Sequence, residues 1–270
     1  MQIVDNKVAF ITGGASGIGL GMAMAFAEAG MKIVLADIDE ARAKTAAHQM
    51  SEAGARALGL HLDVTDRAAW ERAARSAEAA FGEVDLLCNN AGVAGIIKPV
   101  ADIPIEEWRW LTEVMLFGMV HGLQCFVPRM KANGRGHIVN TSSVGGLSPV
   151  PMFGEYVAAK HAVVGISTTL RLEVEADNIG VSVLCPGAVK TSLGESTLRQ
   201  RPSRAISAGN RTDLIKNLNW RYIEPIEAGR IVLGGIRANR SFIFTHPEDL
   251  KLIEAQHAEI TAAFYALSKK

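Results

Sequence analysis

Residues 155–160 read EYVAAK and place Tyr156 four positions before Lys160. Residues four apart share one face of a helix, so the two side chains are expected to meet. A tyrosine has a pKa near 10, too high for an efficient base at neutral pH, but a neighbouring ammonium favours its phenolate form. Such a pair can take a proton from a hydroxyl group or return it. The spacing recurs at Tyr265 and Lys269, so spacing alone does not identify a site.

A glycine-rich stretch, ITGGASGIG at 11–19, follows an apolar run and precedes a helical pattern. Gly13, Gly17 and Gly19 leave the backbone bare where a pyrophosphate would approach a helix N-terminus. The spacing differs from the familiar G-x-G-x-x-G, and a tight turn without a ligand is the alternative interpretation. The position in the first strand-turn-helix unit favours a dinucleotide site.

Asp37 ends the second apolar run. A carboxylate there can accept hydrogen bonds from both ribose hydroxyls of adenosine, and it repels a 2′-phosphate. The glycine loop carries no Arg or Lys to pair with that phosphate. Both features favour NAD over NADP, although a solvated aspartate is the alternative. Asp63 and Val64 end the third run, where they are expected to hold the adenine edge and face.

The elements that must position these residues alternate along the chain. Continuous apolar strands separated by helices indicate a parallel sheet covered on both faces, the doubly wound α/β fold. About seven strands are predicted, at 7–13, 32–37, 57–64, 84–92, 136–143, 180–187 and 241–245, with helices at 18–29, 41–53, 66–81, 105–131 and 153–176. We interpret 1–270 as a single domain, with a substrate lid at about 192–222 and a C-terminal helical segment at 246–270.

Composition disfavours several classes of function. Basic and acidic residues number 28 each, so no global charge favours nucleic acid or anionic lipid. Cys88, Cys125 and Cys185 lie apart in apolar segments and form no metal-ligand pair, so buried reduced thiols and a cytoplasmic location are expected. We found neither a signal peptide nor an apolar run long enough to span a membrane, and we predict no metal site.

Five segments in this order, TGGASGIG, NNAG, NTSS, YVAAK and PGAVKT, resemble the short-chain dehydrogenase/reductase family. The resemblance implies a one-domain Rossmann-like fold that moves hydride between a nicotinamide cofactor and an alcohol or ketone. The family's catalytic serine lies 13 residues before its tyrosine, which is Ser143 here, whereas Ser142 would point to the other side of its strand. Tyr265 has Leu252 at that distance, so we interpret it as a packing residue on a C-terminal helix.

The resemblance also assigns roles around the cofactor. Ser143, Tyr156 and Lys160 are the implied catalytic residues, with Lys160 also binding the nicotinamide ribose. The implied cofactor-binding residues are Gly13, Ser16, Gly17, Ile18, Gly19, Asp37, Asp63, Val64, Asn90, Tyr156, Lys160, Val189 and Thr191.

One position departs from the family pattern. An asparagine usually lies in the fourth helix, where it is thought to kink the helix and hold a water linked to the lysine. This chain has Met115 there, a good helix former that cannot hold the water in the same way. The departure indicates another proton route, slow turnover or a specialised substrate. His121 is six positions on and is expected to pack or to be solvated.

The leading hypothesis is an NAD-dependent dehydrogenase of a secondary alcohol, or reductase of the ketone. Its substrate would be hydrophobic, of medium size and aromatic or cyclic, because 93–99, 144–153 and 192–222 are mainly apolar. The alternatives are an NADPH-dependent carbonyl reductase and a catalytically weak nucleotide sensor or scaffold. A homodimer or homotetramer is expected from the family, with no nucleic-acid or membrane partner.

Overall fold

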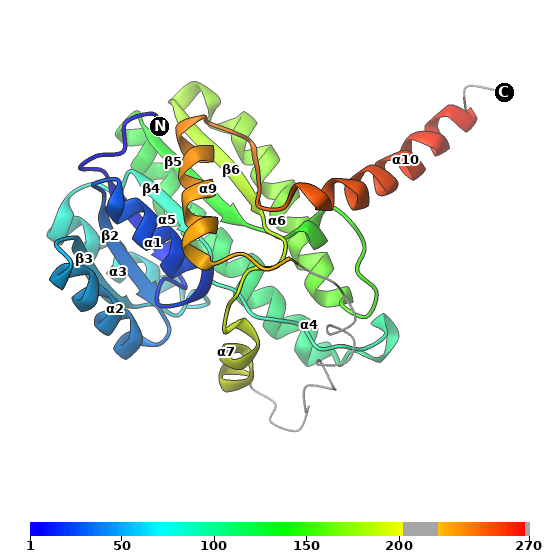
Figure 1. The fold of residues 1–270 in the computed structure, drawn as a ribbon, viewed down its shortest axis with the longest axis horizontal. Coiled ribbons are helices and arrows are strands. Elements are labelled where there is room, and N and C mark those ends of the chain that lie inside the picture. Colours follow the sequence, from blue (N-terminus) through cyan, green and yellow to red (C-terminus); the bar gives the residue numbers. More distant parts are fainter. Residues whose placement is uncertain (202–220, 268–270) are drawn as a thin grey trace.

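The computed structural model describes residues 1–201 and 221–267, and it contains one seven-stranded sheet (Figure 1). Every pairing is parallel, and the strand order is β3-β2-β1-β4-β5-β6-β7. The strands are β1 (Val8–Thr12), β2 (Lys32–Asp37), β3 (Arg56–His61), β4 (Leu86–Asn89), β5 (Gly136–Thr141), β6 (Ile179–Cys185) and β7 (Phe242–Phe244). The predicted doubly wound α/β fold is confirmed, with strand ends shifted by a few residues.

Helices cover both faces of this sheet, because successive strand residues point to opposite sides. In β1, Val8 and Phe10 join a core with α3, α5 and α6, whereas Ala9 and Ile11 join a core with α1, α2 and α9. The described α-helices are α1 (Gly17–Glu28), α2 (Glu40–Glu52), α3 (Arg67–Phe81), α4 (Ile105–Thr112), α5 (Gly118–Ala132), α6 (Gly154–Glu173), α7 (Leu193–Gln200), α9 (Pro225–Arg237) and α10 (Leu250–Leu267).

The strand order reverses between β1 and β4, which are neighbours although they are not consecutive in sequence. Ligands of doubly wound sheets bind at the carboxyl ends of the strands near such a reversal. The Thr12 hydroxyl at the end of β1 accepts hydrogen bonds from the backbone N–H groups of Asn90 and Ala91, at 2.9 and 3.0 Å. The two loops that leave these strands are therefore fastened together.

The helix expected at 105–131 is not continuous. A π-helical turn at Glu113–Phe117 separates α4 from α5, and Met115 is buried within it. The irregularity therefore occurs without the asparagine that the family resemblance associates with a kink. By length and hydropathy alone Ile105–Ala132 could cross a membrane, but Met119 and Phe126 of this stretch are buried in the core of the chain.

The three cysteines are buried and unpaired, as predicted. Burial raises the pKa of the Cys125 and Cys185 thiols to about 12, and it also raises the pKa of Cys88. These thiols therefore stay protonated near neutral pH, and they are core side chains rather than nucleophiles.

The C-terminal helix α10 projects away from the body of the chain (Figure 1), and none of its residues is buried. Tyr265 lies on this helix and is 67% exposed. The interpretation of Tyr265 as a residue that packs against the rest of this chain is therefore wrong. Of the segment interpreted as a lid, α7 and residues 221–222 are described, whereas 202–220 lie outside the described residues. The interpretation of 1–270 as one domain stays a prediction.

Candidate functional site

The glycine loop joins β1 to the N-terminus of α1. Gly13 and Gly17 have φ angles of 61° and 52°, a conformation that favours residues without a Cβ. Ser16 is the N-cap of α1, yet its side chain makes no capping hydrogen bond, in contrast to Asp39 at α2 and Asp66 at α3. The first N–H groups of α1, which include those of Ile18 and Gly19, lack intrahelical acceptors and suit an anionic group.

Asp37, at the end of β2, binds the same loop. One carboxylate oxygen accepts the N–H of Ala15 at 3.0 Å, and the other accepts the N–H of Asp39 at 3.0 Å. A carboxylate has about four acceptor positions, so both oxygens can still accept further hydrogen bonds. The sequence thus places a negative charge beside the glycine loop, as the ribose-binding hypothesis requires.

An open groove of about 700 Å³ runs along the loop and the N-terminus of α1. A carbon atom added at Gly17 would lie 3.0 Å from Thr191 Cγ2, so the loop after β6 closely approaches the glycine loop. The groove is lined by Ala15, Ser16, Gly17, Leu20, Arg42, Val189, Lys190, Thr191, Ser192, Glu195 and Tyr222. Its length of bare backbone and its helix N-terminus fit a dinucleotide.

The residues expected at the adenosine end of the site make hydrogen bonds within the protein, but they do not line the groove. The Asn90 side-chain amide donates to the carbonyl of Thr12 at 3.0 Å, which fixes the loop after β4. The Asp63 carboxylate accepts hydrogen bonds from the N–H and hydroxyl of Thr65, at 2.9 and 2.8 Å. Val64 is buried, and its carbonyl is within hydrogen-bond distance of the Trp70 and His121 rings. Neither Asp63 nor Val64 is among the residues that line the groove.

Ser143 and Tyr156 lie around one point, although they come from the end of β5 and the start of α6. A carbon atom added at Gly145 would lie 3.6 Å from Ser143 Oγ and 3.9 Å from Tyr156 Cε1. Ser143 Oγ accepts the N–H of Gly145 at 3.1 Å, so its own proton is available to another acceptor. Ser142 instead donates to the Lys160 carbonyl at 2.8 Å inside the core.

Lys160 lies beneath Tyr156 on the same helix face. Its ammonium is 5.6 Å from the centre of the Tyr156 ring and donates to the Thr141 carbonyl at 2.9 Å. The residue is only 5% exposed, and this burial lowers the pKa of the ammonium to about 8. The charge is therefore largely kept at neutral pH but is sensitive to its surroundings.

Met115 forms part of the wall beside this pair. It packs in a small apolar cluster with Val93, Leu111 and Ala159, against which Tyr156 also packs. A carbon atom added at Gly92 would lie 3.5 Å from the Met115 sulfur and 3.9 Å from Lys160 Nζ. The methionine thus places an apolar thioether near the lysine, in agreement with the lowered pKa of Lys160.

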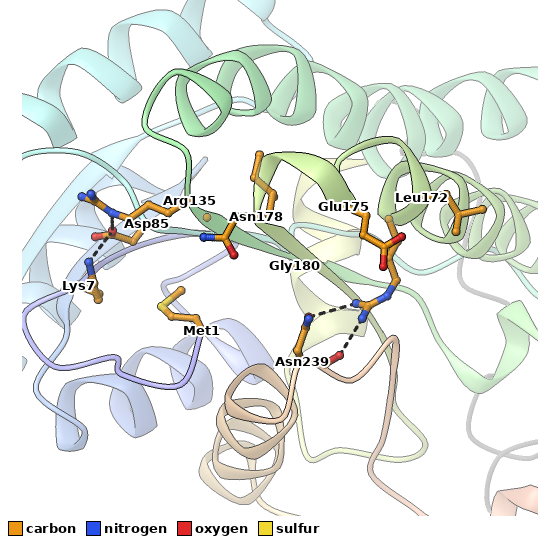
Figure 2. Close-up of a pocket in the computed structure, with 12 residues that line it drawn as sticks. Met1, Lys7, Asp85, Arg135, Leu172, Glu175, Asn178, Gly180 and Asn239 are labelled. Carbon is orange, nitrogen blue, oxygen red and sulfur yellow. Dashed lines mark hydrogen bonds and ion pairs between the residues drawn. The ribbon is translucent and has the colours of Figure 1, made fainter.

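A second pocket, of about 240 Å³, lies at the opposite, amino-terminal end of the sheet (Figure 2). There Asp85 pairs with Lys7 at 3.2 Å and with Arg135 at 2.9 Å, and Arg171 donates to the carbonyl of Asn239 at 2.9 Å. The Asp85 carboxylate is thus paired with two cations, and the Arg171 guanidinium has a carbonyl acceptor. None of the motifs named in the sequence analysis lines this pocket. We therefore place the candidate active site at the carboxyl edge.

The family model for short chain dehydrogenases matches residues 7–202, which include the glycine loop and the Ser143, Tyr156 and Lys160 group. The chain belongs to the short-chain dehydrogenase family. Its Rossmann-like fold and its membership of a family of oxidoreductases follow from this match.

Similar proteins agree with this assignment. The chain is 35% identical over 254 residues to a C alpha-dehydrogenase of Sphingobium sp. strain SYK-6, covering 92% of this chain and 83% of that protein. It is 34% identical to a 3-alpha-(or 20-beta)-hydroxysteroid dehydrogenase of Mycobacterium tuberculosis, covering 84% and 81%. A short-chain dehydrogenase/reductase from Burkholderia phymatum, solved in complex with NAD, superposes with a TM-score of 0.89 at 34% identity, covering 97% of both chains.

Sequence reasoning missed several residues of this short-chain dehydrogenase. Arg42, on α2, lines the groove although it lies outside the glycine loop. Glu107 and Arg201 form a buried ion pair, and Glu155 is buried beside Tyr156. A charged residue within an apolar helical stretch, such as Glu155 in the EYVAAK segment, is the sequence feature that could have indicated a buried polar contact. The sequence does not show which residue it contacts, because Ile96 is far away along the chain.

The lowered pKa of Lys160 predicts a pH-dependent stability. Between about pH 8 and pH 10.5 the unfolded chain holds this proton and the folded chain does not, so stability rises with pH across this window. Lys160→Met lacks the effect. We expect the free energy of unfolding of the wild type, measured in urea without cofactor, to rise relative to that of Lys160→Met by about 2 kcal/mol from pH 7 to pH 9.5. An identical difference at the two pH values would contradict a buried, titrating ammonium.

Proposed function

We propose that this chain is an NAD-dependent oxidoreductase that interconverts a secondary alcohol and its ketone. The observation that carries the proposal is the grouping of Ser143, Tyr156 and Lys160 at the carboxyl edge of the sheet. The groove along the glycine loop lies at the same edge, although none of the three residues lines it. The family assignment supports oxidoreductase chemistry, and both named relatives are dehydrogenases.

The cofactor would lie along the groove, with its diphosphate at the N-terminus of α1 and its nicotinamide toward Tyr156. When bound, it accepts or supplies a hydride at the nicotinamide ring. We assign its binding to Gly13, Ser16, Gly17, Ile18, Gly19, Asp37, Asp63, Val64, Asn90, Tyr156, Lys160, Val189 and Thr191.

Proton transfer is the task of the chain's own residues. Tyr156 removes the hydroxyl proton of the alcohol, or returns it in the reverse direction. Ser143 Oγ accepts the N–H of Gly145, which leaves its hydroxyl proton for another acceptor. In the proposed mechanism Ser143 donates this hydrogen bond to the substrate oxygen and so holds the substrate in place. Lys160 uses one of its three N–H donors on Thr141, and the others are available to ribose hydroxyls. Its charge favours the phenolate of Tyr156.

A hydrophobic substrate of medium size, aromatic or cyclic, is supported by two mainly apolar segments, 93–99, which contacts Tyr156, and 144–153, which lies between Ser143 and Tyr156 in the sequence. The names of the similar proteins, a hydroxysteroid dehydrogenase among them, point the same way.

Tyr156→Phe tests the mechanism. Removing the phenol oxygen should lower kcat for the best substrate of an alcohol panel by about 10²–10⁴-fold, because general acid–base catalysis is worth that much. NADH formation measures the rate, and NAD binding should persist. Tyr265→Phe is the matched control, since it makes the same change at the other tyrosine-lysine pair, on the exposed helix α10.

The outcomes separate the hypotheses. Full activity of Tyr156→Phe would reject the mechanism while leaving the enzyme class intact. A wild-type protein that binds NAD but oxidises none of the panel would favour the alternative of a nucleotide sensor or scaffold, which Met115 supports.

Cofactor choice is a separate question, because two groups near the groove oppose each other. Asp37 repels a 2′-phosphate, whereas Arg42 lines the groove and could pair with one, which keeps the NADPH-dependent alternative open. We expect initial rates at equal concentrations to favour NAD over NADP by about tenfold or more, because juxtaposed like charges cost several kcal/mol. Asp37→Ser should narrow this ratio, and Arg42→Ala should widen it. Faster turnover of NADP by the wild type would overturn the NAD assignment.

A homodimer or homotetramer is proposed for the assembly. One face of α10 carries apolar residues three, four or seven positions apart, the spacing of a helix seam that packs against another helix: Leu250, Ile253, Ile260, Phe264 and Leu267. All of these except the half-exposed Ile253 are exposed within the described chain. An isolated helix of this length is marginal in water, so a second copy is a suitable partner.

This seam makes the assembly testable. Phe264→Glu should shift the protein toward smaller species in size-exclusion chromatography with light scattering, because it places a charge in the apolar seam. Ala262→Glu adds the same charge on the opposite side of α10 and should leave the mass unchanged. Equal masses for wild type and Phe264→Glu would show that the seam of α10 does not form the interface between copies.

The location of the protein is proposed as cytoplasmic. The three buried thiols suit a reducing compartment, where unpaired cysteines persist.

A further inference from the structure

Three side chains from different elements hold the backbone of residues 94–96, in the loop after β4. The Thr197 hydroxyl on α7 accepts the N–H of Ala94 at 2.8 Å. Arg201, just after α7, donates to the carbonyl of Ala94 at 3.3 Å. Glu155 on α6 accepts the N–H of Ile96 at 2.7 Å. A loop without regular structure is thus fixed at three backbone atoms by buried or partly buried polar groups.

This loop lies directly against the proposed acid/base. A carbon atom added at Gly95 would lie 2.5 Å from Glu155 Oε1 and 3.3 Å from Tyr156 Cβ. The glycine therefore lets the backbone contact the base of the tyrosine side chain. Val93, one residue before the held segment, packs in the apolar cluster that also contacts Tyr156. A shift of the loop would move the surface on which the tyrosine rests.

Arg201 is itself held by a buried ion pair. Its guanidinium Nε lies 3.3 Å from Glu107 Oε2, and the two side chains are 3% and 4% exposed. The guanidinium carbon also lies 5.7 Å from the centre of the Trp110 ring. Glu107 and Trp110 both belong to α4, so Arg201 connects that helix to the loop.

A buried ion pair is weak evidence for stability, since apolar side chains of similar volume often stabilise a fold equally well. What an apolar pair cannot do is donate a hydrogen bond to the Ala94 carbonyl while contacting α4. The planar guanidinium carries five donors in a rigid arrangement, which suits such a bridge.

We propose that Arg201, oriented by Glu107, is a positioning residue that fixes Ala94–Ile96 against Tyr156. Its role is to hold the wall beside the reacting oxygen, and it contacts neither substrate nor cofactor itself. The effect on rate rests on the proposed oxidoreductase function, whereas the effect on the loop does not.

The test compares Arg201→Met with the double variant Arg201→Met/Glu107→Met. The single variant leaves the Glu107 carboxylate buried without its partner and should be destabilised. The double variant removes both charges and should recover a melting temperature close to that of the wild type. It still lacks the donor to Ala94, so kcat/KM for the alcohol should fall by about tenfold to a hundredfold, as small misplacements do. Its dissociation constant for NAD should stay that of the wild type.

Hydrogen–deuterium exchange provides a readout that needs no activity. Peptides covering 93–97 should exchange about tenfold faster in the double variant, while peptides of β1 and β5 remain unchanged. Arg199→Met is the matched control, because it makes the same substitution on an exposed side chain two residues away. It should alter neither exchange nor rate.

The results distinguish two failures. A double variant with wild-type exchange at 93–97 and wild-type kcat/KM would overturn the positioning role and leave an ordinary buried ion pair. A wild-type protein that oxidises no alcohol would reject the proposed function, and the exchange comparison would still decide the role of Arg201. If Arg201→Met does not fold, the double variant alone carries both measurements.

Discussion

The buried ammonium of Lys160 is the interaction around which the carboxyl edge of the sheet is arranged. Removing a charge from water is costly, and the Thr141 carbonyl at 2.9 Å returns only part of its hydration. The same helix, α6, carries Tyr156, so the ammonium lies 5.6 Å from the centre of the tyrosine ring. A lysine in this state interacts strongly with any polar group placed beside it, such as a ribose hydroxyl or a phenolate. In the mechanism proposed above, the cost of burial is what would couple cofactor, tyrosine and lysine into one unit.

Most of the fold and much of the site could be predicted from sequence, because both depend on local patterns. Continuous apolar strands indicated a parallel sheet, and the ends of such strands necessarily meet at one edge. Ser143 distinguished Tyr156 from Tyr265 through the serine-tyrosine spacing that the family resemblance implies, and the structure brings Ser143 and Tyr156 together. Tyr265 itself was misjudged, because periodicity shows that a helix has an apolar face but not whether the same chain covers it.

The residues that were missed share a different property. Glu107 and Arg201 pair although they are distant along the chain, and Arg42 lines a groove whose other wall comes from residues 189–195. Nothing in the sequence beside these three residues marks them. The π-helical turn around Met115 was missed for a related reason. A methionine is an ordinary helix former, so the irregular turn arises from tertiary packing against the loop after β4 and α6 rather than from local propensity.

That π-helical turn sets how the faces of α4 and α5 are oriented relative to each other. A π turn contains about one residue more than an α turn, and each residue of an α-helix advances the chain by about 100° around the axis. If residues 113–117 formed regular α-helix at their present length, the extra residue would rotate α4 relative to α5 by about that angle. Met119 and Phe126 could not then face the core while Leu111 faces Tyr156. The π turn is therefore what allows both helices to bury their apolar faces at the present length of this segment.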